Sequence, residues 1–385
     1  MEKTPEILIY LMKCSLQNTK PEEAPLARAD LEALLRLARA HSVSAMVCMA
    51  LEKTAIFAGA DDAVKKHWRE AKNKAIRKNM LLDAERAAIM MQLESAGIWH
   101  MPLKGSILKD WYPKPGMREM ADNDILFDPS ERKRVRGIFQ SRGYKIVSFG
   151  KGNHDDYEKP PIYNFEMHVS LFHEMYPKLA GQYQNVKEKL LPVDGTVCQF
   201  AFTPEDFYVF ALAHAYKHYS GSGTGVRTLA DFYVMNHHLG GIMNWDEVEQ
   251  KLTRLGIAEY EQHSRVLAEK LFSGARPLPE IELNTDEKEM LRFYCDATTY
   301  GTIDNQIQSR LQELQGNAEG ITLRTKLKYC CVRLFPGKEF CKYNYPFVYH
   351  HLWMLPFFWV WRIAGKGISH RKKVKRELTF LRERQ

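Results

Sequence analysis

The sequence lacks the patterns expected of a secreted or membrane-spanning protein. Its seven cysteines are an odd number and form no Cys-x-x-Cys pair, which argues against a disulfide framework. It contains no run of about 18 uncharged apolar residues, so we expect no membrane-spanning helix. The first residues carry neither a basic segment nor a small-residue cleavage site, so secretion is not expected. These absences predict a cytoplasmic protein.

Two familiar catalytic motifs are also missing. The glycine-rich segment 221–225 is not followed by Gly-Lys-Ser/Thr, so it is not a P-loop. His214 and His218 lie one helical turn apart, but the residues between them exclude a His-Glu-x-x-His metalloprotease motif, and no third zinc ligand is evident. We expect this pair to be structural or to reach a nucleotide from a helical region.

Composition and charge separate the chain into two parts. Its 385 residues are 45% hydrophobic and 26% charged, which is ordinary for a globular protein with room for two or three domains. The net charge of +8 is uneven, because residues 321–385 hold 15 Lys/Arg against three Asp/Glu. The chain before residue 321 therefore carries about −4 and is mildly acidic.

The most informative stretch is 101–128, which predicts a strand, a Gly-Ser turn, a helix and a second strand. A buried strand is expected over 97–103, and a helix is expected to start at Ser106, with Ser106 as its N-cap. Because Gly105 has no Cβ, the backbone there can approach a phosphate closely. The N-terminus of the following helix would face the same anion.

The second predicted strand, 121–127, carries two carboxylates. Side chains alternate along a strand, so Asp122 and Asp124 share one face, whereas Asn123 lies on the other face with apolar residues. Two neighbouring carboxylates in water-poor surroundings repel each other unless a cation lies between them. Oxygen ligands at this spacing suit Mg²⁺, which leaves the rest of its octahedron to water and substrate phosphates.

Other segments are predicted as follows. In order, we expect helices within 1–60, a long helix over 63–96, a helix over 130–143, a strand over 144–147, a loop over 150–161, a strand over 163–172 and a helix capped by Thr203. On the strand 163–172, Glu166 and His168 share one face, while the other face is apolar. Arg227 and Asp231 are spaced to support each other on a later helix.

These motifs resemble a known family. Leu-Lys-Gly-Ser, then Tyr-Pro, then Gly-Met-Arg-Glu-Met-x-Asp-x-Asp-Ile-Leu within 103–126 are similar to the bacterial "uncharacterised nucleotidyltransferase" family, part of the superfamily that includes DNA polymerase beta. The later Glu-x-His strand and the His-x-x-x-His, glycine-rich, Arg-x-x-x-Asp pattern extend the resemblance over roughly 30–240. The resemblance implies an α+β fold with a mixed β-sheet core, flanked by N-terminal and C-terminal helical regions.

The resemblance also implies roles for individual residues. Asp122, Asp124 and Glu166 would be the catalytic and metal-binding carboxylates for Mg²⁺ (or Mn²⁺), with Glu166 as the base for an attacking hydroxyl. The nucleotide-binding candidates are Lys104, Gly105, Ser106, Arg118 and His168. Family members usually carry a hydrophobic residue where this chain has Asn123, and this departure is expected to weaken packing behind the strand.

We predict four regions along the chain. They are an N-terminal helical region at 1–95, a nucleotidyltransferase core at 96–202, a helical domain at 203–320 and a basic, aromatic-rich helical segment at 321–385. Within the last region, 347–361 is rich in aromatic residues and 370–376 is a basic cluster. This segment has three interpretations: packed helices, a membrane-surface contact or a nucleic-acid contact.

The predicted function is transfer of a nucleoside monophosphate from an NTP, such as ATP, to a hydroxyl acceptor, with release of pyrophosphate and two-metal Mg²⁺ catalysis. A small-molecule acceptor is favoured because the catalytic half is not basic. The sequence is also compatible with a toxin-type enzyme that modifies RNA or protein through the basic tail. Outside catalysis, it is compatible with a degenerate nucleotide-binding or scaffold protein, or with a peripheral partner of a surface-polysaccharide pathway held at the inner membrane surface by 345–385.

Overall fold

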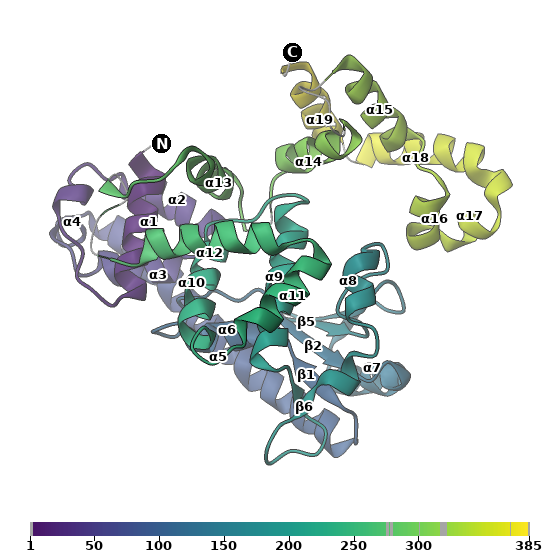
Figure 1. Cartoon of the computed structure of the whole chain (residues 1–385), viewed down its shortest axis with the longest axis horizontal. Helices are drawn as coiled ribbons and strands as arrows, with labels where there is room; N and C mark the ends of the chain where they lie inside the picture. Colours follow the sequence, from purple (N-terminus) through teal and green to yellow (C-terminus); the bar gives the residue numbers. More distant parts are fainter. Residues whose placement is uncertain are drawn as a thin grey trace. The chain divides into compact units, whose positions relative to one another are not determined.

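The chain folds into two compact units in a computed structural model that describes residues 3–274, 277, 280–299, 301–315, 322–369 and 371–383 (Figure 1). The first unit takes in the described residues of Met1–Tyr216 and Gly225–Thr299. The second takes in those of Lys217–Thr224 and Tyr300–Gln385. The four-region division drawn from the sequence stays a prediction.

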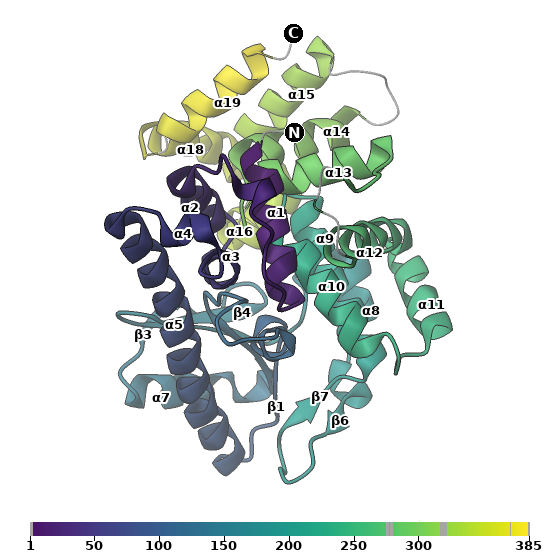
Figure 2. The ribbon, with the colours of Figure 1, turned by 90° about the vertical axis from the view of Figure 1, so that its left-hand side faces the viewer.

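Helices open the first unit, as predicted. They are α1 (Lys3–Leu16), α2 (Leu31–Ala40), α3 (Ser44–Leu51), α4 (Ala55–Ala58) and α5 (Asp62–Ser95). Asp30 caps α2 by accepting hydrogen bonds from the backbone N–H groups of Glu32 and Ala33. The long helix α5 runs beside α7 and β1 (Figure 2) and ends one residue before the predicted limit.

A five-stranded mixed sheet follows in the order β1-β2-β5-β4-β3, which confirms the predicted α+β class. β2 and β5 pair in parallel, and the remaining neighbours are antiparallel. The strands are β1 (His100–Pro102), β2 (Asn123–Phe127), β3 (Lys145–Ser148), β4 (His154–Lys159) and β5 (Tyr163–His168).

Strand β4 lies where the sequence predicts a loop, so that prediction is wrong. The segment reads His-Asp-Asp-Tyr-Glu-Lys and carries one large apolar ring, Tyr157, which is fully buried. Asp155 on the same face is also buried, and it pairs with Arg132 at 2.6 and 2.7 Å. The alternating apolar pattern of a strand is therefore interrupted, because a charged residue in an ion pair occupies a buried position.

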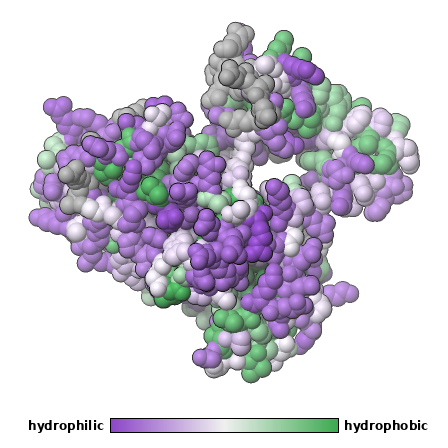
Figure 3. Space-filling model, viewed as in Figure 1, coloured by the Kyte–Doolittle hydropathy of each residue, from purple (hydrophilic) through white to green (hydrophobic). Residues whose placement is uncertain are grey.

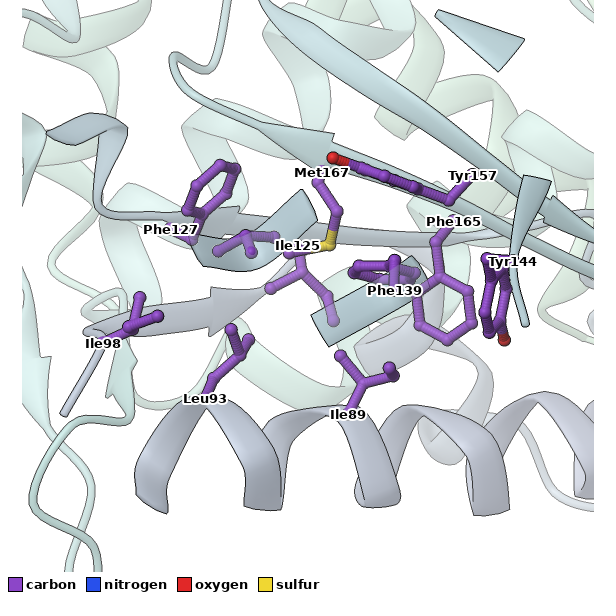
Figure 4. Packing of buried hydrophobic residues seen from close by; sticks show 11 residues of the cluster. Ile89, Leu93, Ile98, Ile125, Phe127, Phe139, Tyr144, Tyr157, Phe165 and Met167 are labelled. Carbon is purple, nitrogen blue, oxygen red and sulfur yellow. The ribbon is translucent and has the colours of Figure 1, made fainter. Parts of the chain in front are cut away.

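One face of the sheet packs against α5 and α7 (Arg132–Ser141) (Figure 4). Period-two alternation along β2 and β5 directs apolar side chains to this face. The cluster is formed by Ile89 and Leu93 of α5, Val135 and Phe139 of α7, and Ile98, Ile125, Phe127, Tyr144, Tyr157, Phe165 and Met167. The opposite face of the same strands is therefore left for polar side chains.

The first unit continues with further helices and a small hairpin. These elements are α6 (Gly105–Leu108), α8 (Pro177–Gln182), β6 (Leu191–Pro192), β7 (Phe200–Ala201), α9 (Pro204–Tyr219), α10 (Arg227–Leu239), α11 (Trp245–Leu255), α12 (Ala258–Phe272) and α13 (Thr285–Asp296). The 3₁₀ turns η1 (Ala24–Leu26), η2 (Lys109–Trp111), η3 (Pro129–Glu131) and η4 (Val186–Lys189) connect its elements. Thr203 caps α9, because its Oγ1 accepts a hydrogen bond from the backbone N–H of Asp206 at 3.1 Å. The predicted cap is confirmed.

From residue 301 onward, the described regular elements of the second unit are all helices. Its helices are α14 (Ile303–Gln315), α15 (Leu323–Leu334), α16 (Lys338–Asn344), α17 (Pro346–His350), η6 (Leu352–Met354), α18 (Leu355–Ser369) and α19 (Arg371–Glu383). Among the described residues, no helix combines the length and apolar character needed to cross a membrane. Of the predicted basic cluster 370–376, His370 and the side chains of 371–374 lie outside what the structure describes.

Candidate active site

The polar face of the sheet gathers acidic and imidazole side chains from three strands. In the parallel pairing of β2 with β5, Asp124 lies opposite Glu166. In the antiparallel pairing of β4 with β5, Asp156 lies opposite Glu166 and His154 lies opposite His168. Residues in register on neighbouring strands point to the same face, so these five side chains form one surface. The predicted carboxylates Asp124 and Glu166 meet there.

Asp122 lies one residue before β2, because the strand predicted over 121–127 begins at Asn123 in the structure. Burial, followed by repulsion from Asp124 and Glu166, raises the pKa of Asp122 to about 6. The structure brings Asp124 and Glu166 together on neighbouring strands, with Asp122 directly before β2.

Asp124 is held in the ionised form by its neighbours. Burial alone raises the pKa of Asp124, but the charge of Lys104 and the hydrogen bond from His168 outweigh burial, so the pKa is lowered. The Nζ of Lys104 lies 3.2 Å from Oδ1 of Asp124, and Nε2 of His168 lies 2.8 Å from the same oxygen. The pKa of His168 is raised, because its hydrogen bonds to Asp124 and Glu166 outweigh burial.

The turn before α6 has an uncommon backbone. Lys104 has φ of 44° and ψ of −111°, a conformation that side-chain-bearing residues seldom adopt. Strained residues of this kind persist where the surrounding structure holds them, and they often lie at functional sites. This conformation places the ammonium group of Lys104 beside Asp124.

Gly105 is required by a close approach of Arg118. A Cβ added at Gly105 would lie 2.5 Å from Nη1 of Arg118 and 3.1 Å from Met120 Cε. Arg118 is buried, and its Nε and Nη2 donate to the two carboxylate oxygens of Asp231 at 2.8 and 3.1 Å. Tyr112 donates to the same carboxylate at 2.7 Å.

The contact between Arg118 and Asp231 changes two interpretations. Spacing along the sequence pairs Asp231 with Arg227, but the structure places Arg118 on it. Arg118 therefore packs against the Gly105 turn, and two of its guanidinium nitrogens already donate hydrogen bonds to Asp231. Its predicted role as a triphosphate ligand stays a prediction.

Ser106 does not act as the predicted N-cap. The helix starts at Gly105, and its N-cap position is Lys104, which makes no side-chain capping bond. The buried hydroxyl of Ser106 donates to the backbone carbonyl of Leu103 at 2.8 Å. This bond closes the turn, because it ties the first helical residues back to the end of β1.

Asn123 is fully buried, and its side-chain amide is hydrogen-bonded to α5. Its Nδ2 donates to the carbonyl of Leu82 at 3.0 Å, and its Oδ1 accepts from Arg86 at 3.1 Å. These bonds attach β2 to α5 on the face opposite the carboxylates. The departure from the family pattern thus leaves the polar face unchanged.

His154 and Asp156 are the site residues that the sequence did not reveal. Nε2 of His154 lies 3.3 Å from Asp156 Oδ1 and 4.0 Å from Glu166 Oε2. Burial and the neighbouring His168 lower the pKa of His154. The alternation His-x-Asp within 154–156 was the available signal, but it lay in a segment predicted as loop.

The donor set fits a hard divalent cation. The three carboxylates supply the oxygen ligands that Mg²⁺ and Mn²⁺ accept. Burial and then repulsion from Asp124 and Glu166 raise the pKa of Asp122, and a bound cation would offset both effects. Asp122, Asp124 and Glu166 are therefore the residues that could hold it. His214 and His218 lie on α9, and neither belongs to a three-ligand group among the described residues.

A separate cavity of about 530 Å³ lies between α5, β1 and the segment 106–111. Ser106, Arg86, Asp110 and Trp111 help to line it, whereas none of the three carboxylates does. We place the chemistry at the carboxylates rather than in this cavity, because paired acids and a strained lysine turn are found there.

Comparison with known proteins defines the class. Residues 27–273 match the family described as "Uncharacterised nucleotidyltransferase", so the chain belongs to this family. A solved structure, an antigenic nucleotidyltransferase-like protein from Paracoccidioides brasiliensis, matches with 16% identity and a TM-score of 0.31, covering 50% of this chain and 92% of that one. No curated protein matches. The predicted family is thus confirmed.

Proposed function

We propose that the protein transfers a nucleoside monophosphate from an NTP to a hydroxyl group of a small molecule and releases pyrophosphate. One observation supports this proposal above the others. Asp124 and Glu166 stand in register on parallel strands, with Asp122 beside them and Lys104 in contact with Asp124. Family membership supports a transferase of this general kind.

Different side chains of the site have different roles in the proposed reaction. Asp122, Asp124 and Glu166 would hold Mg²⁺ or Mn²⁺, which supplies charge neutralisation and lowers the pKa of the attacking hydroxyl. Lys104 and His168 keep Asp124 ionised. Gly105 leaves room for the Arg118 guanidinium and allows close approach of a phosphate.

The proposed reaction needs one group that accepts the proton of the attacking hydroxyl. The acceptor oxygen forms a bond to the α-phosphorus, and the bond between that phosphorus and its bridging oxygen breaks as pyrophosphate leaves. Glu166 takes the hydroxyl proton, because its partly exposed carboxylate stands next to Asp124 on the neighbouring strand. In this scheme Asp124 stays ionised throughout.

A small-molecule acceptor is supported by charge. Residues before 321 carry about −4, which disfavours a polyanionic RNA at the catalytic unit. A degenerate scaffold is disfavoured because Asn123, the departure that suggested it, bonds to α5 and leaves the carboxylates in place. The second candidate for the acceptor is RNA or protein bound through the basic tail.

Calorimetric titration of the four NTPs with Mg²⁺ tests the proposal. We expect one NTP to bind the wild type in a metal-dependent manner and the double variant Asp122→Asn/Asp124→Asn to lose this binding. Asp286→Asn, at an exposed position at the start of α13, is the matched control and should bind normally. Absence of binding to the wild type, or unchanged binding by the double variant, would contradict the proposal.

A further inference from the structure

We propose that His154, Glu166 and His168 form a nitrogen-containing site for a divalent transition-metal ion such as Mn²⁺, Co²⁺ or Zn²⁺. Among the described residues, these three side chains can each offer one ligand atom, and the three atoms lie within 4.8 Å of one another. The inference rests on the proposed function in one respect, because Glu166 belongs to both sets of ligands.

The imidazoles converge on one carboxylate oxygen. Nε2 of His168 lies 3.5 Å from Oε2 of Glu166, and Nε2 of His154 lies 4.0 Å from it. Ligands held at about 2.1 Å from one ion are separated by at most roughly 4.2 Å, so small side-chain adjustments would close the site. Asp124, which already contacts His168 at 2.8 Å, is next to it.

The backbone holds this geometry before any ion arrives. His154 and His168 are cross-strand partners on β4 and β5, and Glu166 is two residues from His168 on the same face. The Nδ1 atoms of both histidines are buried and have no hydrogen-bond partner among the described residues. Carboxylates face the Nε2 atoms, because Nε2 of His168 donates to Asp124 and Nε2 of His154 lies near Asp156. A metal that binds at Nε2 therefore displaces a proton, and the unpartnered Nδ1 of each ring can carry it instead.

Exposure and chemistry decide which ions fit. The side chains of His154 and Glu166 are about one-third exposed, so an ion can enter from solvent, whereas His168 is almost fully buried beneath them. Mg²⁺ prefers oxygen ligands and water, while imidazole nitrogen favours transition metals. The oxygen-only pair Asp122 and Asp124 suits Mg²⁺, and the mixed set suits a softer ion.

Cobalt binding to the full chain tests this inference without relying on activity. We expect one Co²⁺ per chain in the presence of excess Mg²⁺, with visible absorption that reports nitrogen ligation. His154→Ala and His154→Gln should each weaken Co²⁺ affinity by at least about 10–100-fold. His67→Ala, at an exposed position on α5, should leave both affinity and spectrum unchanged.

The outcomes separate this inference from the proposed function. Metal-dependent NTP binding with no ligand-field spectrum for Co²⁺ overturns the inference and leaves the function standing. Nitrogen-ligated Co²⁺ lost on His154 substitution, in a chain that binds no NTP, supports the inference and overturns the function. Equal Co²⁺ binding by wild type and both His154 variants, with unchanged melting temperatures, overturns the inference.

A second inference comes from an independent surface in the second unit. We infer that α17, η6 and α18 dock on an anionic membrane surface. Five large apolar side chains there are each more than 60% exposed: Phe347, Trp353, Phe357, Val360 and Trp361. Positions 357, 360 and 361 follow helical spacing on α18, so they form a stripe, and Trp353 lies in η6 just before this helix. Figure 3 shows hydrophobic residues gathered on this unit.

The charge around this apolar surface indicates that anionic lipid would bind it. Residues 322–365 contain seven Lys/Arg and one acidic residue, Glu339, so the surroundings of the stripe are cationic. Exposed Trp and Phe beside Lys and Arg match a helix that lies in the headgroup region of anionic lipid.

Vesicle flotation of the full chain tests this surface. We expect flotation with vesicles containing phosphatidylglycerol, weaker flotation with pure phosphatidylcholine, and loss of flotation in Trp353→Ser/Phe357→Ser/Trp361→Ser. Val197→Ser, at an exposed apolar residue of the first unit, should float as the wild type does. Undiminished flotation of the triple variant overturns the inference. The inference is also overturned if the wild type does not float but dimerises without lipid, and the triple variant abolishes this dimer. In that case a second copy of the chain covers the apolar face.

Discussion

Arg118 and Asp231 form a two-point ion pair across 113 residues of sequence, with Nε–Oδ1 at 2.8 Å and Nη2–Oδ2 at 3.1 Å. Both side chains are nearly buried, and Tyr112 donates to the same carboxylate. The pair attaches the loop after η2 to α10, and Arg118 in turn contacts the Gly105 turn.

Removing Asp231 is expected to destabilise the first unit. Asp231→Ala leaves the Arg118 charge buried and uncompensated, which should lower the free energy of unfolding by about 3–5 kcal/mol. Urea denaturation measures this loss, and Asp194→Ala, at an exposed acidic position, is the control. If Asp231→Ala unfolds at the same urea concentration as the wild type, the pair does not support the fold.

Gly105→Ala is expected to disrupt the turn. Its Cβ would lie 2.5 Å from Arg118 Nη1, so either the backbone or the guanidinium must shift. We expect a loss of about 1–3 kcal/mol in unfolding free energy together with loss of NTP binding. Gly137→Ala is the matched control, because Gly137 lies within α7 with open space around it and should gain up to about 1 kcal/mol. Normal NTP binding by Gly105→Ala would show that the close approach has no functional role.

Asn123→Leu is expected to separate stability from function. Leucine restores a hydrophobic residue between the aspartates but removes the bonds to Arg86 and Leu82, so the unfolding free energy should fall by about 1–3 kcal/mol. NTP affinity should stay within about twofold of the wild type, since the side chain faces α5. Calorimetry and denaturation on the same preparation check both statements. Loss of NTP binding in a folded Asn123→Leu variant would place Asn123 in the site.

His41 is expected to make stability depend on pH. Burial lowers the pKa of His41 to about 4, and its Nδ1 accepts a hydrogen bond from the Val226 backbone. In the unfolded chain the group takes up a proton near pH 6.5, so the unfolded state binds more protons between about pH 6.5 and 4. Stability is therefore retained above this window and lost as pH falls through it, by about 3 kcal/mol.

Comparison with His41→Asn isolates this contribution. Asparagine can accept the same backbone bond but does not titrate. Urea denaturation at about pH 7.5 and about pH 4.5 should show a smaller loss of stability in the variant, by about 2–3 kcal/mol. Parallel losses in the two proteins would mean that other groups dominate acid unfolding.

The sequence predicted those parts of the site that depend on local periodicity. The polar face that carries Asp124, the apolar face around Ile125 and the Glu166 strand all follow from alternation with period two. The long α5 followed from an uninterrupted helical pattern that ended near Gly97.

What the sequence did not predict depends on contacts between distant segments. β4 was missed because an inward-facing position of this strand holds a charged residue. Asp155 is buried there through its ion pair with Arg132, and an apolar residue at this position would have indicated a strand. Ser106 was assigned as a cap because spacing cannot show that its hydroxyl bonds back to Leu103. The partner of Asp231 lies 113 residues away, and no local rule selects it over Arg227.

The Arg118–Asp231 pair also has a consequence for the order of events during synthesis on the ribosome. The strands and α5 emerge before α10, so the loop that holds Arg118 is made 113 residues ahead of its counter-ion. At about 5–20 residues per second, this interval is roughly 6–23 s. During that time the sheet can form its apolar face, but the Gly105 turn lacks the group that anchors Arg118 against it. Completion of the packing around the Gly105 turn therefore waits for the arrival of α10.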